Sequence, residues 1–120
     1  MTDTVYGDAS LSDLEFSQIT QVILDGIESQ LDAWLQSDII DIDASRSGGV
    51  LELTFPDRSK IVINTQPPMR ELWLASKAGG FHFRWAHKKW IDTKSGDDFF
   101  HVLSRSASEQ GRLTLTFASP

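Results

Sequence analysis

The order of helical and strand-like segments predicts an α+β protein, a two-layer α/β sandwich in which two terminal helices pack on one face of a roughly six-stranded antiparallel sheet. An amphipathic helical pattern opens the chain, about six short alternating segments follow, and a second helical pattern comes near the end. Consecutive strands joined by short turns pair antiparallel, and both helices can cover the same face. The other face then meets solvent, and exposed apolar residues there require a reason.

The composition fits one domain without cysteine chemistry. The chain has 120 residues, of which 40% are hydrophobic and 23% charged, and it contains no cysteine. Disulfides, thiol catalysis and zinc fingers are therefore excluded. Apolar runs are only a few residues long, and the acidic start lacks the features of a signal peptide. We expect a cytoplasmic protein with a mobile tail at residues 1–11 and a single domain at residues 12–120.

The first predicted helix starts at Ser12 and runs to about Gln36. Ser12 and Glu15 have the spacing of a capping box, in which each side chain accepts from the other residue's backbone N–H. One face carries a row of residues that we expect to pack on the sheet: Phe16, Ile19, Ile23, Ile27, Gln30, Leu31 and Trp34. The opposite face carries the carboxylates of Asp25, Glu28 and Asp32.

Alternating segments predict the strands at residues 38–43, 51–55, 60–64, 71–75, 81–85 and 89–92. In the first, Ile40 and Ile42 alternate with aspartates, which indicates an edge strand whose charge discourages pairing with other chains. Residues 45–49 form the turn after it. Pro67-Pro68 makes a rigid corner, because proline cannot donate to a sheet ladder.

The C-terminal region predicts a second helix that begins near Phe99 and ends at Gly111, with Ser95 as the candidate N-cap. Residues 113–117 alternate once more and form either a final strand or an extended tail packed on the helices. We expect the aromatic residues of this half of the chain to belong to the core: Phe81, Phe83, Trp85, Trp90, Phe99 and Phe100.

The charge is strongly asymmetric. Residues 1–43 contain ten of the 17 carboxylates and no Lys, Arg or His, although the net charge of the whole chain is only −6. This distribution argues against nucleic acid or an anionic membrane as a partner, and it favours a cation or a basic protein surface. Several carboxylates supply hard oxygen donors that would bind Ca²⁺, Mg²⁺, Mn²⁺ or Fe²⁺ weakly through water. The alternative is an ordinary solvated helix face.

The open sheet face is the second candidate site. Strand parity places Asn64, Gln66 and Trp73 outward, since Ile61, Ile63, Leu72 and Leu74 face the core. An exposed tryptophan flanked by amides has the composition of a protein-binding hot spot. The alternative is a tryptophan half-buried by its neighbours. Catalytic motifs are lacking: the three histidines have no metal-ligand spacing, and the glycines have no phosphate-loop pattern.

The chain resembles the frataxin family, especially its bacterial branch, over about residues 12–117. The matching stretches are Ile27-Glu28-x-x-Leu31-Asp32-x-Trp34, Gly48-Gly49-Val50-Leu51, Ser59 to Asn64 with Gln66 and Pro68, Leu72-Trp73-Leu74-Ala75, Ala78 to Phe83, and Trp90-Ile91. The segment from Asn64-x-Gln66 to Trp73-Leu74-Ala75 is the most specific part.

This resemblance implies a non-enzymatic, iron-binding protein that modulates iron–sulfur cluster assembly by binding the cysteine desulfurase and its scaffold protein, as iron donor or iron sensor. It implies weak binding of Fe²⁺ or Fe³⁺ on an acidic ridge and partner contacts through Asn64, Gln66 and Trp73. With Asp38 added from the sequence, the expected ridge is Asp25, Glu28, Asp32, Asp38, Asp41 and Asp43. We expect a monomer by default.

Two alternatives stay open. The first is iron storage through iron-driven oligomers with ferroxidase activity, and the second is an interaction module without a metal role. Two departures from the family pattern matter here. Ser29 and Ala33 stand where family ridges often continue a carboxylate pair, which argues against a high iron capacity. Glu71 stands where the family often has an amide, two residues before the tryptophan.

Overall fold

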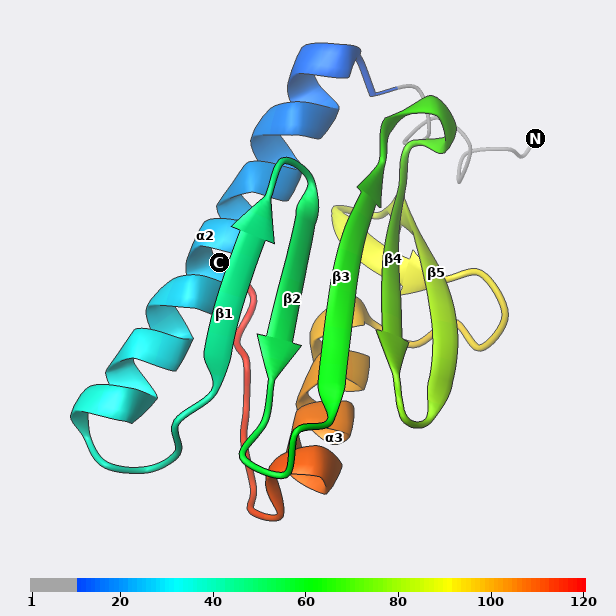
Figure 1. The fold of residues 1–120 in the computed structure, drawn as a ribbon. Helices are drawn as coiled ribbons and strands as arrows, with labels where there is room; N and C mark the ends of the chain where they lie inside the picture. The colour runs from blue at the N-terminus through cyan, green and yellow to red at the C-terminus, as the bar shows by residue number, and fades with distance from the viewer. Residues whose placement is uncertain (1–10) are drawn as a thin grey trace.

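The computed structural model describes residues 11–120, and one antiparallel sheet with two helices on one face accounts for its architecture (Figure 1). The elements in chain order are α2 (Asp13–Gln36), β1 (Asp43–Ser47), β2 (Val50–Thr54), β3 (Lys60–Gln66), the 3-10 turn η2 (Pro67–Met69), β4 (Glu71–Ser76), β5 (Gly79–Ala86), β6 (Lys89–Asp92) and α3 (Phe99–Gly111). The six strands lie in sequence order, each antiparallel to the next. The predicted fold class is confirmed.

The helix α2 begins as the sequence predicted. Ser12 Oγ accepts from the Glu15 backbone N–H at 3.0 Å, and Glu15 Oε1 accepts from the Ser12 N–H at 2.9 Å. These bonds satisfy donors that a helix start leaves unpaired, and they lower the pKa of Glu15. The predicted inner face is buried against the sheet, apart from Ile19 and Gln30, which are partly exposed.

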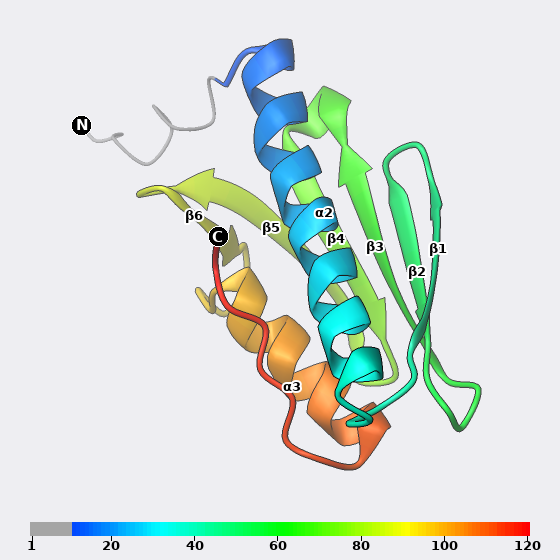
Figure 2. The same ribbon diagram turned by 90° about the vertical axis from the view of Figure 1, so that its left-hand side faces the viewer.

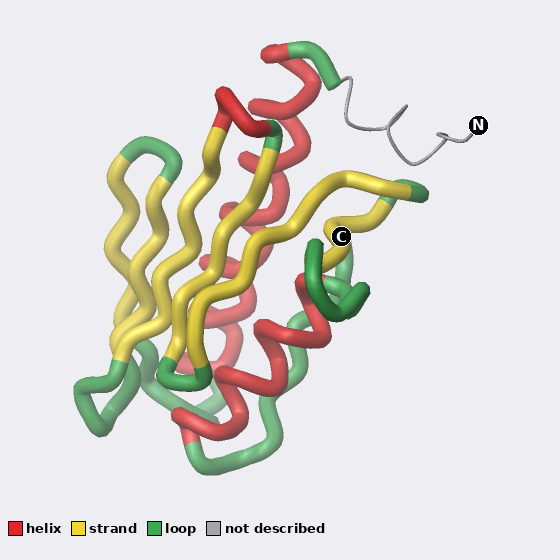
Figure 3. Tube along the Cα trace, turned by 90° about the vertical axis from the view of Figure 1, so that its right-hand side faces the viewer, coloured by secondary structure: helices red, strands yellow, loops and turns green. Residues whose placement is uncertain are grey.

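The core lies between the sheet and the helices (Figure 2). Alternate residues of β2, β3 and β4 are fully covered there, among them Leu53, Ile63 and Leu72. The expected aromatic residues contribute as well, although Phe81 and Trp85 are only partly buried. Neither of the described helices lies over the opposite face of the sheet (Figure 3).

The first predicted strand is wrong in its position. Residues 38–42 connect α2 to the sheet, and β1 starts only at Asp43, so most of the predicted turn is strand. Ile42 is buried without belonging to the ladder, because the connection packs against the core and this packing produces the alternation. The hairpin itself turns at Gly48 and Gly49: Gly48 has a φ of +58°, and a Cβ on Gly49 would lie 2.0 Å from Thr65 Oγ1.

The C-terminal region differs in its caps. Asp98, and not Ser95, caps α3, since its side chain accepts from the Phe100 N–H at 3.0 Å. Gly111 is the last helical residue, and Arg112 adopts the left-handed conformation that ends the helix. Residues 113–117 form no strand. They form the extended tail of the second alternative, with Leu115 and Phe117 buried.

The tail lies in the groove between the two helices. The Phe117 ring packs against the Trp34 ring of α2, with 4.9 Å between the ring centroids. The hydroxyls of Ser104 and Ser108 on α3 form hydrogen bonds with the tail backbone. Residues 1–10 of the predicted N-terminal tail lie outside the described residues; Leu11 packs against the core. In residues 11–120, neither helix has the length and apolar content that crossing a membrane would need.

Candidate functional site

The acidic ridge, defined as Asp25, Glu28, Asp32, Asp38, Asp41 and Asp43, lies along α2, the connection after it and the start of β1. Glu28 is partly buried, and the other five residues are exposed. The ridge does not form one compact site. Asp43 pairs with Thr54 at the strand parity of the open sheet face, so it points away from α2. Among residues 11–120, no three acidic or histidine side chains converge as a metal site requires.

Arg46 divides the helical part of the ridge. It projects from β1 toward α2, because its strand partner Leu51 faces the core, and its Nη1 lies 2.6 Å from both Asp25 Oδ1 and Glu28 Oε1. Its Nη2 also donates to the Gln21 side chain. The bond to Asp25 raises the pKa of Arg46 above its ordinary value, against the opposing effect of burial. Arg46 thus pairs with two of the six carboxylates, and its single positive charge offsets one of their two negative charges.

The donor chemistry of the ridge still fits iron as a weakly held cargo. Carboxylate oxygens are hard donors, and exposed single carboxylates bind such ions largely through water. Asp32, Asp38 and Asp41 form no ion pair with another described residue. The ridge is therefore an anionic surface with local neutralisation, and not a preformed coordination cage.

The second surface lies on the open sheet face. Asn64 pairs with Trp73, and Gln66 pairs with Glu71, so the three predicted contact residues do meet on neighbouring strands. All three are partly exposed. Trp73 is covered on one side by His82 of β5. The two rings stack with 4.1 Å between their centroids and an angle of 8° between their planes. The half-buried alternative describes Trp73 better than free exposure.

Glu71 organises this face. Its side chain is only 8% exposed, it accepts from Trp73 Nε1 and from Arg84 Nε at 2.8 Å each, and it lies 4.0 Å from His82 Nδ1. Burial by itself raises the pKa of Glu71, but the bonds from Trp73 and Arg84 outweigh it and lower the pKa below its ordinary value. The charged carboxylate thereby holds the Trp73 indole and the Arg84 guanidinium in place on the open face of the sheet.

A shallow hollow of about 170 Å³ lies beside Trp73. Ala75 and Gly80 line it, and their small size leaves the space open. Asn64 and His82 also line it. A fixed aromatic wall next to such a hollow can receive a side chain from another protein. We refer to Asn64, Gln66, Glu71, Trp73, His82 and Arg84 together as the tryptophan platform.

Sequence reasoning missed three residues of these surfaces. His82 and Arg84 alternate with Phe81 and Phe83, so strand parity could have placed them beside Trp73. Arg46 is the first basic residue of the chain, but nothing local in the sequence indicates which carboxylates it reaches.

Comparison with known proteins agrees with these features. The family model that describes the frataxin-like domain matches residues 9–113 of this chain. The chain is 44% identical over 110 residues to the iron–sulfur cluster assembly protein CyaY of Polaromonas sp. (strain JS666), covering 92% of this chain and 95% of that protein. It is 43% identical over 109 residues to the CyaY protein of Burkholderia mallei, covering 91% and 100%.

Solved structures give the same result. Frataxin from Psychromonas ingrahamii superposes with a TM-score of 0.80 at 32% identity, covering 91% of this chain and all of that one. Trimeric yeast frataxin, solved in complex with ferrous iron, superposes with a TM-score of 0.66 at 27% identity, covering 78% and 85%. On its sequence and its fold, this chain belongs to the frataxin family.

Proposed function

We propose that this protein acts in iron–sulfur cluster assembly, as a non-enzymatic modulator that binds the cysteine desulfurase and its scaffold protein in the cytoplasm. The relatives at 43–44% identity are named as iron–sulfur cluster assembly proteins, and the match covers nearly their whole length. The observation that carries the finer proposal is the presence of two chemically different surfaces, the acidic ridge and the tryptophan platform, on separate parts of one small fold.

The acidic ridge supplies attraction. Its exposed carboxylates lie on the first helix and the connection that follows it, in a third of the chain that has no basic residue before Arg46. Such a surface accelerates encounter with a basic partner and raises the local concentration of cations. In this proposal, the ridge contacts basic surface on the desulfurase and holds Fe²⁺ weakly, as donor or sensor.

The tryptophan platform supplies shape. Trp73 is held by the bond to Glu71 and by stacking on His82, so little side-chain freedom is lost when a partner covers it. Tryptophan is enriched at the energetic centres of protein interfaces. The scaffold protein is the partner that we assign to this surface, with Asn64 and Gln66 as its polar contacts.

The test is desulfurase turnover and binding with a ridge variant, Glu28→Gln with Asp32→Asn, Asp41→Asn and Asp43→Asn. The variant should bind the desulfurase more weakly, and its remaining affinity should depend less on salt, because fewer charges contribute. A control changes Asp57→Asn and Glu109→Gln, two exposed carboxylates outside the ridge, and the loss of affinity is compared per charge removed. Equal loss in both variants, or an unchanged salt dependence, would contradict a specific ridge contact.

A second experiment separates the two surfaces. Trp73→Ala should impair binding to the scaffold and leave Fe²⁺ binding and the fold intact, since Trp73 lies on the face opposite the core. Circular dichroism checks the fold. If Trp73→Ala unfolds the domain, the tryptophan is structural and the platform loses its assigned role.

Iron storage through oligomers is the second candidate. It is favoured by the structural likeness to a yeast frataxin that is trimeric and was solved with ferrous iron. Light scattering after aerobic addition of Fe²⁺ distinguishes the two proposals. A modulator stays largely monomeric, whereas a storage protein grows into larger particles and consumes oxygen as it oxidises the metal.

A further inference from the structure

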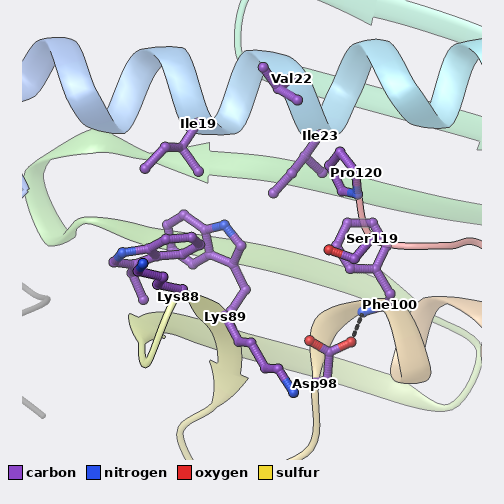
Figure 4. Close-up of a pocket in the computed structure, with 11 residues that line it drawn as sticks. Ile19, Val22, Ile23, Lys88, Lys89, Asp98, Phe100, Ser119 and Pro120 are labelled. Carbon is purple, nitrogen blue, oxygen red and sulfur yellow. Dashed lines mark hydrogen bonds between the residues drawn. The ribbon is translucent and has the colours of Figure 1, made fainter.

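A pocket of about 590 Å³ lies on the helical side of the molecule, away from the tryptophan platform (Figure 4). Its residues come from four segments of the chain: Ile19, Val22 and Ile23 of α2, Trp85, Lys88, Lys89 and Trp90 of the β5–β6 hairpin, Asp98 and Phe100 at the start of α3, and Ser119 and Pro120 of the tail. Its volume lies within the range of small-molecule sites, roughly 300–1,000 Å³.

The walls are apolar, and the charge is concentrated on one side. Figure 4 shows Ile19 and Ile23 extending from α2 toward the space and Lys88 on the opposite side, whereas the Lys89 side chain runs away from α2. Within residues 11–120, neither lysine forms an ion pair. The carboxylate of Asp98 is engaged in capping α3. One cation, Lys88, and the backbone side of Lys89 therefore border an apolar space whose one carboxylate, Asp98, is already in use.

Trp90 adds an unmet hydrogen-bond donor to the same wall. Its side chain is 2% exposed, and its Nε1 is buried without a hydrogen-bond partner among the described residues. Buried indole N–H groups usually have an acceptor, and leaving one unpaired is unfavourable. An acceptor atom that entered beside Trp90 would remove this deficit.

We propose that this pocket binds a small organic anion, a carboxylate attached to an apolar ring or chain. The apolar body would cover Ile19, Ile23 and Phe100, and the carboxylate would face Lys88; a small movement of the side chains that cover Trp90 would let it accept from Nε1 as well. Charge complementarity selects an anion over a neutral or basic compound. This inference does not rest on the proposed function, because it uses neither the acidic ridge nor the tryptophan platform.

The probe is 2-naphthoate, and 2-naphthamide is the uncharged compound of the same shape. Nitrogen–proton NMR of the full chain should show the Trp90 indole signal moving with naphthoate, which should bind about ten-fold more tightly than naphthamide. Equal affinity for the two compounds, or a Trp90 signal that does not move, would overturn the proposal.

The variants locate the site. Lys88→Gln with Lys89→Gln should weaken naphthoate binding about ten-fold and leave naphthamide unaffected, whereas Lys94→Gln, an exposed lysine outside the pocket, should change nothing. Val22→Trp should fill the space and abolish binding of both compounds; Val22 is 51% exposed, so the fold tolerates the change. Unchanged affinity in either pocket variant contradicts the assignment.

Two other occupants are separated by the same spectra without any probe. If the Trp90 signal moves when the protein is diluted, a second copy of the chain occupies the pocket. If it moves in the full chain carrying Tyr6→Ala, the N-terminal segment occupies it. Either result overturns the proposal of a small anion.

Discussion

Glu71 is a carboxylate that the sheet buries on its solvent-facing side. Two donors, Trp73 Nε1 and Arg84 Nε, compensate for the lost hydration, and together they keep its pKa below the ordinary value. A group with a lowered folded-state pKa stabilises the fold above its unfolded pKa, and this contribution is lost as the pH falls through the folded value. The ionised Glu71 side chain therefore stabilises the folded protein at neutral pH.

Glu71→Gln should lower the free energy of unfolding by about 1–3 kcal/mol at pH 7, because a neutral amide cannot accept from both donors as a carboxylate does. The difference from the wild type should shrink as the pH falls below the ordinary carboxyl pKa, and it should vanish as the pH falls through the lowered pKa of folded Glu71. Urea denaturation at several pH values measures both effects. Glu52→Gln, which removes only an exposed pair with Lys60, serves as the control, and a pH-independent difference would contradict this role.

Arg46 connects two elements, the edge strand β1 and the helix α2. Its side chain is 19% exposed, whereas the side chains of its partners Asp25 and Glu28 are 67% and 35% exposed, so the arginine is the most buried member of the network. The pairing has two consequences. It attaches the edge strand to the helix, and it occupies two carboxylates of the acidic ridge that would otherwise be available to a cation or a partner.

Arg46→Gln should lower stability by only about 1 kcal/mol, as expected for a surface network. It should at the same time strengthen binding of Mn²⁺ or Fe²⁺ near Asp25 and Glu28, since the competing cation is gone. Anaerobic NMR titration detects the metal, and thermal unfolding detects the stability change. Arg105→Gln is the matched control, because Arg105 pairs only with Asp97, at 3.9 Å, away from the ridge. Weaker metal binding in Arg46→Gln would refute the competition.

Hydrogen bonds to α3 and an aromatic contact with α2 attach the C-terminal tail to the helices. Ser108 donates to and accepts from Leu115, and Ser104 does the same with Phe117. Phe117→Ala should cost about 3 kcal/mol of stability, because the ring is 4% exposed and packs on Trp34. Thr116→Ala, which changes the exposed neighbour, should cost little. Equal urea midpoints for the two variants would show that the tail is not part of the core.

At the scale of the whole molecule, the sheet separates the surfaces to which we assign different roles. Figures 2 and 3 show both described helices and the C-terminal tail on one side of the sheet. The core and the apolar pocket lie on that helical side, and the tryptophan platform lies on the open side. The acidic ridge follows the edge where α2 meets β1. Changes on one of these surfaces can therefore leave the others intact, which is why the proposed variants are informative.

The described residues share one core cluster, to which both helices, the sheet and the tail contribute. Unfolding should therefore be a single cooperative transition. Tryptophan fluorescence and far-ultraviolet circular dichroism should give the same urea midpoint, since Trp34, Trp85 and Trp90 report on the core and dichroism reports on the helices. Separate midpoints would indicate that the β5–β6 hairpin or α3 melts on its own.

Local rules predicted most of the fold correctly. The capping box predicted the N-cap residue of α2, Ser12, correctly. The alternation predicted the bounds of β2 to β6 to within one or two residues. The errors occur where packing and hydrogen bonding give similar patterns. Ile40 and Ile42 alternate because they cover the core edge, and Ser95 resembles an N-cap but belongs to a loop in which it bonds to Asp92.

The sequence by itself determined the two-layer architecture, the acidic character of the first third, and the position of Trp73 on the open face of the sheet. These properties follow from composition and from periods of two and 3.6 residues, which act over short stretches of chain. Only the tertiary structure decided that Arg46 occupies part of the acidic ridge, that Glu71 and His82 hold Trp73 half-buried, and that an apolar pocket lies below α2. Apart from the bond between Glu71 and Trp73, these features depend on side chains that lie apart in sequence and that strand register and helix packing bring together.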